Sequence, residues 1–245
     1  MLINAHDHMD AYRDRLPRAL QNIEEKGILT LGVAEDPGSY DFVKKLAKDH
    51  PLIKKGFGIH PWKVSAKTSL EGLDSYLEDC DFIGEIGLDS VWAPSSSHPE
   101  DQLRVFRFFL EEAQKRSLLS NIHTKGREKE VLEELQRIRL PRCIIHWYSG
   151  PLSLVPAYLD RGAYFTISSD FMDSSLTLKL MDLLPPDRIL TETDGPNSLE
   201  WVRGEYGWPD LVEKILACLA RRKQKSEKEM ERIIEENFHR CFEGA

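Results

Sequence analysis

Short apolar runs recur along the chain, and each is followed by a polar or glycine-rich break and then by a segment with helical spacing. The runs are three to six residues long, a length typical of buried strands. They predict eight strands, at residues 2–5, 29–34, 56–59, 82–86, 118–122, 143–145, 163–168 and 188–192. The residues at or near the C-terminal ends of successive runs lie 22 to 38 positions apart, about one strand-plus-helix unit each. They are His6, Ala34, His60, Glu85, His123, His146, Ser168 and Asp194.

The segments between the runs have the apolar spacing of amphipathic helices. Residues 100–116 carry apolar side chains three or four positions apart, and residues 210–222 repeat the pattern. Ser226 with Glu229 forms a capping-box sequence, which predicts that the last helix begins there.

Eight β/α units without a change in composition predict a single domain over residues 1–245. The expected fold class is α/β, a (β/α)8 TIM-type barrel, in which the catalytic groups lie at the C-terminal ends of the strands. A doubly wound sheet is the alternative, but the chain has no glycine-rich dinucleotide turn.

The first predicted strand leads directly into His6 and His8. Alternate side chains of a strand point to the same side, with a rise of about 3.3 Å per residue, so the two rings are close enough to share one cation. Imidazole is the commonest metal-ligating side chain. Alone this pair is a weak signal, because His-x-His also arises by chance.

A carboxylate lies inside the fourth apolar run. Glu85 is flanked by Gly84 and Gly87, which allow other groups to approach closely. A buried, unpaired carboxylate is costly, so it needs a cation or strong donors. A salt bridge to a neighbouring strand is one explanation, but at a barrel mouth opposite histidines we expect Glu85 to bridge two metal ions.

Three further polar residues end predicted strands. His123 and His146 follow β-branched residues on consecutive strands, and Asp194 ends the last strand. A closed barrel brings the last strand beside the first, so we expect Asp194 to lie next to His6 and His8.

Together these residues predict a metal centre with four histidines and two carboxylates. Six protein ligands are too many for one open catalytic ion, so we expect two divalent ions (Zn, Mn, Mg, Ni or Fe) about 3.5–4 Å apart. One site would comprise His6, His8, Glu85 and Asp194, and the other Glu85, His123 and His146. The expected chemistry is hydrolysis by a metal-bound hydroxide, with Glu85 and Asp194 as catalytic carboxylates and Asp194 taking the proton from the attacking water.

Composition narrows the choice of substrate only a little. The chain has 33 basic and 41 acidic residues, a net charge of −8, so it lacks the excess positive charge with which proteins bind the phosphates of long duplex DNA. Bound cations would supply positive charge locally. The four cysteines have no Cys-x-x-Cys spacing, and neither a signal peptide nor a membrane-length apolar run is present. We therefore expect a cytoplasmic monomer with no membrane association and no obligate protein partner.

Ordered motifs along nearly the whole chain resemble the TatD family of metal-dependent hydrolases, in the amidohydrolase superfamily. They are His6-x-His8-x-Asp10, Gly58-Ile59-His60-Pro61, Gly84-Glu85-Ile86-Gly87-Leu88-Asp89, His123, His146 with Ser149-Gly150, Glu192-Thr193-Asp194-x-Pro196 and residues 237–242. The resemblance implies a TIM-type barrel, divalent metals and deoxyribonuclease activity, often as a 3′→5′ exonuclease on single strands. It also implies metal-ligand roles for His6, His8, Glu85, His123, His146 and Asp194.

The chain departs from the family pattern at several positions. Asn4 stands where the family usually has Asp, and Lys125 stands where it commonly has Arg. Replacing Arg by Lys weakens bidentate recognition of phosphate but retains the positive charge. Trp147 and Tyr148 replace the usual Cys-Phe. The departures leave the metal ligands intact and bear on the substrate.

Four residues are candidate substrate contacts, namely His60, Lys125, Trp147 and Tyr148. Aromatic side chains at a barrel mouth can stack on nucleic-acid bases. Trp62, Trp201 and Trp208 are further candidates for this role, with simple packing of the loops as the alternative. Asp10 and Asp89 are candidates for orienting the ligand histidines.

The leading hypothesis is a metal-dependent phosphodiesterase that acts on the ends of single-stranded DNA as a 3′→5′ exonuclease. The first alternative is a hydrolase of the same fold that acts on a small amide, ester or lactone. The second is a metal-binding scaffold without turnover.

Overall fold

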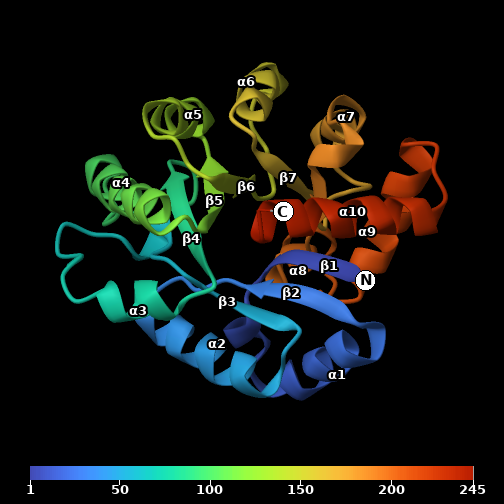
Figure 1. Cartoon of the computed structure of the whole chain (residues 1–245), viewed down its shortest axis with the longest axis horizontal. Helices are drawn as coiled ribbons and strands as arrows, with labels where there is room; N and C mark the ends of the chain where they lie inside the picture. Colours follow the sequence, from blue (N-terminus) through green and yellow to red (C-terminus); the bar gives the residue numbers. More distant parts are fainter. Residues whose placement is uncertain (245) are drawn as a thin grey trace.

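All eight predicted strands are present in the computed structural model, which describes residues 1–244 (Figure 1). They pair in parallel, each with the next along the chain. The strands are β1 (Leu2–Asp7), β2 (Ile28–Gly32), β3 (Ile53–Phe57), β4 (Phe82–Asp89), β5 (Leu119–Lys125), β6 (Arg142–Ile145), β7 (Tyr164–Ile167) and β8 (Ile189–Thr191).

Two strands differ from their predicted bounds in a way that matters for the site. β3 begins at Ile53 rather than at residue 56, because Ile53 pairs with Thr30 of β2 even though lysines follow it. β5 extends to Lys125, which pairs with Asp89 of β4. His123 therefore lies within a strand, and its position is determined by sheet hydrogen bonds.

The barrel closes between β8 and β1 through side-chain and backbone hydrogen bonds. Thr191 Oγ1 donates to the carbonyl of Ile3 at 2.5 Å, and Thr193 N donates to Asn4 Oδ1 at 2.8 Å. Asp194 N donates to the carbonyl of His6 at 3.0 Å. The fold is a nearly closed (β/α)8 barrel, as predicted, and its closure brings Asp194 to the first strand.

Helices surround the strands (Figure 1). They are α1 (Leu16–Lys26), α2 (Pro37–Asp49), α3 (Asp74–Asp79), α4 (Pro99–Arg116), α5 (Glu128–Arg137), α6 (Val155–Asp160), α7 (Ser175–Leu183), α8 (Asn197–Arg203), α9 (Leu211–Arg222) and α10 (Glu227–Phe242), with short 3-10 segments η1 (Met9–Arg15), η2 (Pro61–Lys63), η3 (Leu152–Leu154) and η4 (Pro186–Arg188). The helices predicted at 100–116 and 210–222 are α4 and α9. The capping box is confirmed, because Ser226 Oγ accepts from Glu229 N and Glu229 Oε2 accepts from Ser226 N at 2.9 Å.

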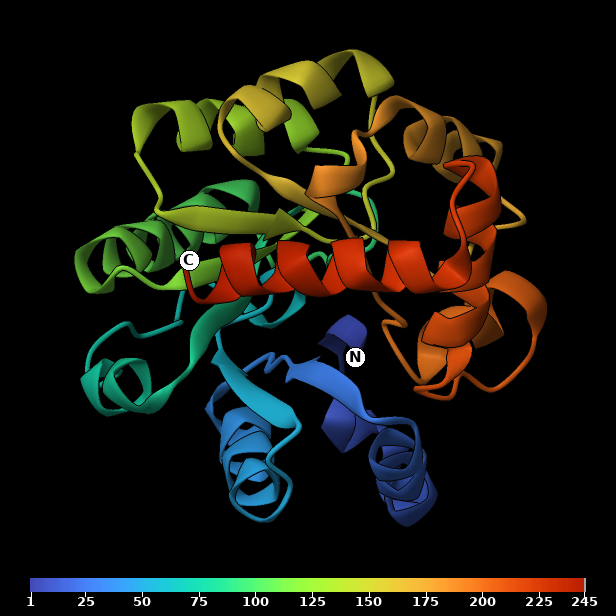
Figure 2. The same ribbon diagram turned by 45° about the vertical axis from the view of Figure 1, so that its right-hand side comes forward.

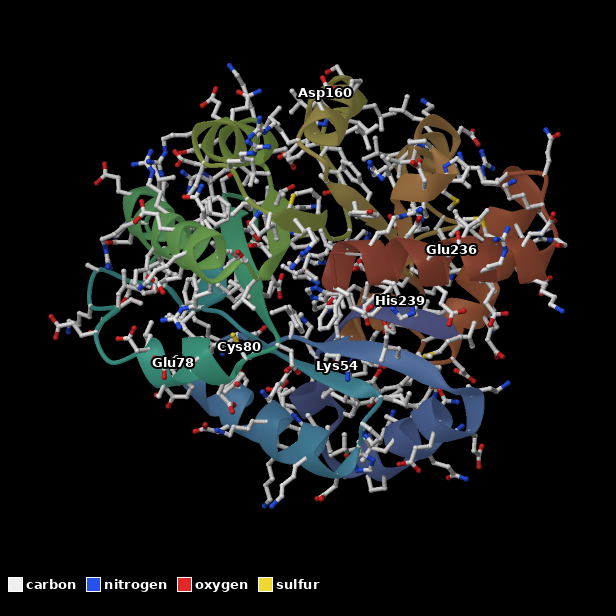
Figure 3. The ribbon with its side chains drawn as sticks, in the orientation of Figure 1. Lys54, Glu78, Cys80, Asp160, Glu236 and His239 are labelled. Carbon is white, nitrogen blue, oxygen red and sulfur yellow. The ribbon has the colours of Figure 1, made fainter. Side chains whose placement is uncertain are left out.

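The last helix, α10, crosses the N-terminal end of the barrel (Figures 1 and 2). Asn237 Nδ2 donates to the carbonyl of Ile189 at the start of β8, at 2.8 Å, and Phe242 contacts Phe82 at the start of β4. Figure 3 labels His239 on the same helix, with its side chain 41% exposed. This end of the barrel is closed by packing, so a substrate must enter at the other end.

The core is apolar and continuous. One cluster of buried side chains fills the barrel and the layer between the strands and most helices, and a smaller one lies beneath η1, α1 and α2. All four cysteines are free and buried. Within residues 1–244, no helix has both the length and the apolar character to cross a membrane.

Candidate metal centre and active-site cavity

A cavity of about 620 Å³ opens at the C-terminal ends of the strands. We call it the active-site cavity. Five of the six predicted ligands line it directly, and the ring of His6 is fully buried beneath them. The remaining lining includes basic and aromatic side chains, among them Lys63, Lys125, Trp62, Trp92, Trp147 and Trp201.

Glu85 lies at the centre of the cluster, and glycines around it make this possible. A Cβ added to Gly58, which follows β3, would lie 2.3 Å from the Glu85 carbonyl oxygen. A Cβ at Gly87, where φ is +152°, would lie 2.0 Å from the His123 carbonyl oxygen. The pairing of β4 is irregular between Ile83 and Ile86. The expectation that the glycines permit close approach is therefore confirmed, and the backbone directs the Glu85 side chain into the barrel.

One oxygen of Glu85 faces the first group of donors. Glu85 Oε2 lies 3.4 Å from His8 Nε2 and 3.5 Å from His6 Nε2. Asp194 Oδ1 lies 3.3 Å from His8 Nε2 and 3.6 Å from His6 Nε2. The first predicted site is thus gathered in one place, including the contact between the first and last strands.

The other oxygen of Glu85 faces a second group of donors. Glu85 Oε1 lies 2.8 Å from His146 Nε2, 3.0 Å from His123 Nδ1 and 3.2 Å from His60 Nε2. His60 was predicted as a substrate contact, yet its ring stands among the donors of this second group and is 3% exposed. His60, Glu85 and His123 together place one donor atom each within 4.8 Å of one another.

The two carboxylates of the centre are held in the ionised form. Burial alone would raise the pKa of Glu85, but the facing imidazoles, His60 foremost, hold it well below its ordinary value. Burial would likewise raise the pKa of Asp194, and the hydrogen bond with His8 lowers it overall. Ionised carboxylate oxygens are the form that binds a cation.

Two histidines of the centre, His8 and His146, are affected in the opposite direction. Burial would lower the pKa of His8, but its hydrogen bond with Asp194 and the charge of Glu85 raise it to about 10. Burial is also outweighed at His146, whose pKa is raised well above its ordinary value by Glu85 and Glu192. The direction of these shifts indicates that the cluster attracts positive charge, and a divalent cation takes the place of such protons when it binds neutral imidazole.

An unpartnered buried oxygen shows that the cluster fits a cation. Glu85 Oε2 is fully buried, and it has no hydrogen-bond partner among residues 1–244. Leaving a charged buried oxygen unsatisfied is costly. The imidazole nitrogens and carboxylate oxygens come from β1, β4 and β5 and from residues that follow β1, β6 and β8. Such oxygens and nitrogens are the donor set of zinc, manganese, iron and nickel sites. The residues present therefore suit divalent metal ions.

Metal removal should lower the stability of the folded chain. A ligand that binds only the native state adds about 2.7 kcal/mol at a hundredfold excess over its Kd, which corresponds to roughly 5–10 °C in Tm for a domain of this size. We expect Tm to fall by this amount after dialysis against a chelator and to recover with Mn²⁺ or Zn²⁺, as measured by differential scanning fluorimetry. A Tm indifferent to both treatments would contradict the fit of the cluster to a cation.

Two polar residues that orient the cluster, Asn121 and Glu192, were not predicted from the sequence. Asn121 Oδ1 lies 2.9 Å from His6 Nδ1, and its amide donates to the carbonyl of Ala5. Glu192 Oε1 lies 3.6 Å from His146 Nδ1. Asn121 and Glu192 each stand two positions before a predicted site residue. Strand periodicity, which puts both on the inward face, is the signal that would have found them.

Asp89 takes the orienting role that was proposed for it, whereas no such contact involves Asp10. Asp89 Oδ2 lies 3.0 Å from His123 Nε2 and accepts a hydrogen bond from Trp62 Nε1 at 2.7 Å. Burial would raise the pKa of Asp89, but His123 and its other donors hold it below its ordinary range. Asp10 lines the cavity, and no side-chain hydrogen bond joins it to a histidine within the described chain.

Three of the four predicted substrate contacts line the active-site cavity in the structure, and one does not. His60, Lys125 and Trp147 line the active-site cavity, whereas Tyr148 does not. Tyr148 is 1% exposed, packs against Tyr158 and Phe165, and donates to the carbonyl of Pro151. The prediction for Tyr148 was wrong, because adjacent residues after a strand end point to different sides.

The aromatic residues at the mouth also differ from the expectation. Trp62 and Trp201 line the cavity, but Trp208 packs against Tyr206 and under Arg18, over the smaller core cluster. Trp92 was not predicted, because its loop carries no motif, and it lines the cavity with 53% of its surface exposed.

Comparison with known proteins agrees with this geometry. A family model described as TatD related DNase matches residues 3–243. Deoxyribonuclease TATDN3 of Homo sapiens is 24% identical over 213 residues, covering 80% of this chain and 78% of that protein. The 3′-5′ ssDNA/RNA exonuclease TatD of Salmonella typhimurium is 30% identical over 162 residues, covering 62% of this chain and 61% of that protein.

A solved structure shares the whole fold. The crystal structure of YJJV, a TatD homologue from Escherichia coli K12, superposes with a TM-score of 0.89 and 23% identity, covering 99% of this chain and 98% of that one. At this identity the likeness speaks for the barrel alone. The family model, in contrast, spans every strand and every member of the His/Glu/Asp cluster. Because of this match, the chain belongs to the TatD related DNase family of metal-dependent hydrolases.

Proposed function

We propose that this protein is a two-metal phosphodiesterase that removes nucleotides from the 3′ end of single-stranded DNA. The observation that carries the proposal is the position of Glu85, whose two carboxylate oxygens face two separate groups of donors. A bridging carboxylate between two groups is the arrangement that a two-ion hydrolytic centre requires. The names of the relatives, a deoxyribonuclease and a 3′-5′ ssDNA/RNA exonuclease, support the choice of substrate.

Bound divalent ions would act as Lewis acids, lower the pKa of a water molecule and neutralise charge on the phosphate. His6, His8 and Asp194 would hold one ion, while His123 and His146 would hold the other, with Glu85 shared. His60 is a candidate further donor to the second ion, in addition to its predicted substrate contact.

Asp194 is our candidate for the general base. Its Oδ1 lies at the edge of the cavity beside His8 Nε2, and it is held in place because its own N–H donates to the carbonyl of His6. Its lowered pKa keeps it ionised and able to accept a proton. His8 Nε2 hydrogen-bonds the same carboxylate, and thereby orients it towards the cavity.

The cavity has basic groups that suit a phosphate-bearing substrate despite the net charge of −8. Arg13, Lys63 and Lys125 line it. These side chains and the bound ions would supply positive charge beside the phosphate backbone of a bound DNA strand. The two rival functions, hydrolysis of a small amide, ester or lactone and metal binding without turnover, do not call for a basic lining.

One assay separates these functions. Purified protein with Mn²⁺ or Mg²⁺ is incubated with single strands labelled at the 5′ end, alongside a panel of simple esters and lactones and a chelator control. We expect a ladder of products shortened from the 3′ end, absent with chelator. Turnover of the small esters alone would favour the small-molecule hydrolase, and no turnover with metals bound would favour the scaffold.

Lys125→Ala is expected to raise KM for oligonucleotides about three- to tenfold and to leave metal content unchanged. Lys125 Nζ lies at the cavity, where it donates to Ser149 Oγ at 2.9 Å. Loss of one phosphate contact should also reduce the slope of log K against log[salt] by about 0.7 for a single strand. Lys129→Ala on α5, where the Lys129 side chain is 80% exposed, is the control. An unchanged KM and salt slope would remove Lys125 as a phosphate contact.

The cytoplasmic location and the monomeric state stay predictions. Assay of cell fractions and light scattering of the purified protein would test them.

A further inference from the structure

Three tryptophans form a recess at one side of the active-site cavity. Trp62, Trp92 and Trp201 alone line a hollow of about 340 Å³, and all three also line the active-site cavity. We call this hollow the tryptophan recess. It comes from three separate segments, namely η2, the loop after β4 and helix α8.

The rings present apolar faces to an open space. The ring centroids of Trp62 and Trp92 are 6.5 Å apart at 74°, and those of Trp92 and Trp201 are 6.4 Å apart at 59°. Trp92 is 53% exposed and Trp201 is 58% exposed. Large aromatic side chains that are exposed together at the rim of a cavity indicate a binding surface rather than core packing.

Hydrogen bonds attach the recess to one half of the metal centre. Trp62 Nε1 and His123 Nε2 both contact Asp89 Oδ2, at 2.7 Å and 3.0 Å. Asp89 Oδ1 accepts from the backbone N–H of Trp92 at 2.8 Å. One carboxylate therefore positions two of the tryptophans and a histidine that faces Glu85 Oε1. The recess lies on the His60 and His123 side of the centre.

A cation stands against the recess. Lys125 Nζ lies 4.4 Å from the centroid of the Trp92 ring, and Lys125 follows His123 by two residues on β5. Aromatic faces beside a positive charge complement a nucleotide, whose base is flat and apolar on its faces and whose phosphate is anionic. Neither the aromatic faces nor the Lys125 cation alone would indicate a nucleotide, but the two occur together beside the metal centre.

We propose that the tryptophan recess binds the base of a nucleotide next to the scissile phosphodiester, with Lys125 contacting its phosphate. The proposal rests on the proposed function and adds a subsite to it. Stacking needs only the face of a base, so the recess accepts all four bases. It also requires a base that has left its stack, so a base inside a duplex is excluded from it.

The test compares the loss of the base with the loss of the ring. Single strands carry one abasic tetrahydrofuran at the 3′-terminal, penultimate or third nucleotide. KM is measured for cleavage, and Kd is measured by anisotropy for phosphorothioate versions of the same strands on metal-loaded protein. One base–aromatic stack corresponds to a factor of roughly 5 to 150.

For the wild-type protein, we expect the abasic site to raise KM and Kd by about tenfold or more at one of the three positions. Trp92→Ala should raise both values for the unmodified strand by a similar factor, and the abasic site at that position should then have no further effect. Trp92→Phe should retain most of the binding. Phe42→Ala on α2, which removes a 38% exposed aromatic ring, is the matched control and should change nothing.

Other outcomes overturn the proposal. If Trp92→Ala and Trp201→Ala leave KM and Kd unchanged while the wild-type protein cleaves single strands, the recess is no base subsite and the proposed function stands. If both variants weaken abasic and unmodified strands equally, the tryptophans act on the backbone or the loop. If the wild-type protein cleaves no strand and the tryptophan variants lose only ester turnover, the proposed function fails as well, and an aryl or alkyl group of a small ester occupies the recess.

Discussion

Glu85→Ala is expected to abolish turnover and to reduce the bound metal from two ions to one or fewer per chain, while the barrel stays folded. Its two oxygens face the two donor groups, one oxygen beside His6 and His8 and the other beside His123 and His146. Without the Glu85 carboxylate, both ions lose the ligand that they would share. We expect kcat/KM to fall by about 10⁴ or more, which corresponds to at least roughly 5 kcal/mol of transition-state stabilisation.

Metal content is measured by mass spectrometry after loading and gel filtration, and folding by circular dichroism. Glu134→Ala is the matched control, because Glu134 is a mostly buried carboxylate on α5 that pairs with Arg107, away from the cavity. Loss of that pair should lower stability by at most about 1 kcal/mol, because the Arg107 side chain is 44% exposed, and should leave metal content and kcat intact. Unchanged metal stoichiometry in Glu85→Ala would count against the bridging role.

Asp194→Asn is expected to reduce kcat by about 10²–10⁴ and to reduce metal content much less. The amide of asparagine keeps an oxygen near His6 and His8, so the first donor group is only weakened. The amide cannot, however, accept the proton of an attacking water. The rate should therefore fall more than the occupancy. Steady-state kinetics at saturating Mn²⁺, with metal content determined on the same sample, measures the two effects separately.

Asp10→Asn is the control for Asp194→Asn. Asp10 lines the same cavity, so its replacement removes one negative charge without touching the hydrogen bond between Asp194 and His8. We expect a near-wild-type kcat for this variant. Full activity of Asp194→Asn would show that Asp194 is not the general base. An equal fall in kcat and in metal content would show that Asp194 acts as a metal ligand only.

Much of the metal centre was predictable because strands impose a simple rule. Alternation puts His6 and His8 on one side of β1, and the parallel order of the strands puts His123 and His146 on neighbouring strands at the same end. The contact of Asp194 with the first strand followed from closure of the barrel. Each of these inferences depends only on position along a strand and on strand order.

Loop residues were less predictable. Tyr148 and Trp147 are neighbours in the sequence, yet Trp147 lines the cavity and Tyr148 lies in the core. Trp147 has a positive φ of 33°, and its N–H donates to Thr166 Oγ1 and Glu192 Oε1. Thr166 lies on β7 and Glu192 directly follows β8, so nothing local in the sequence indicates which way each ring turns.

Apolar periodicity and strand alternation are properties of the local chain, so the eight β/α units, the barrel and the residues that could supply metal donors were predictable without a structure. Three features depended on the packed barrel: which Glu85 oxygen faces which donor group, the place of His60 in the second group, and the meeting of three tryptophans from distant segments in one recess. Distances between side chains on different strands depend on twist, register and loop conformation. These properties arise only when the whole barrel packs.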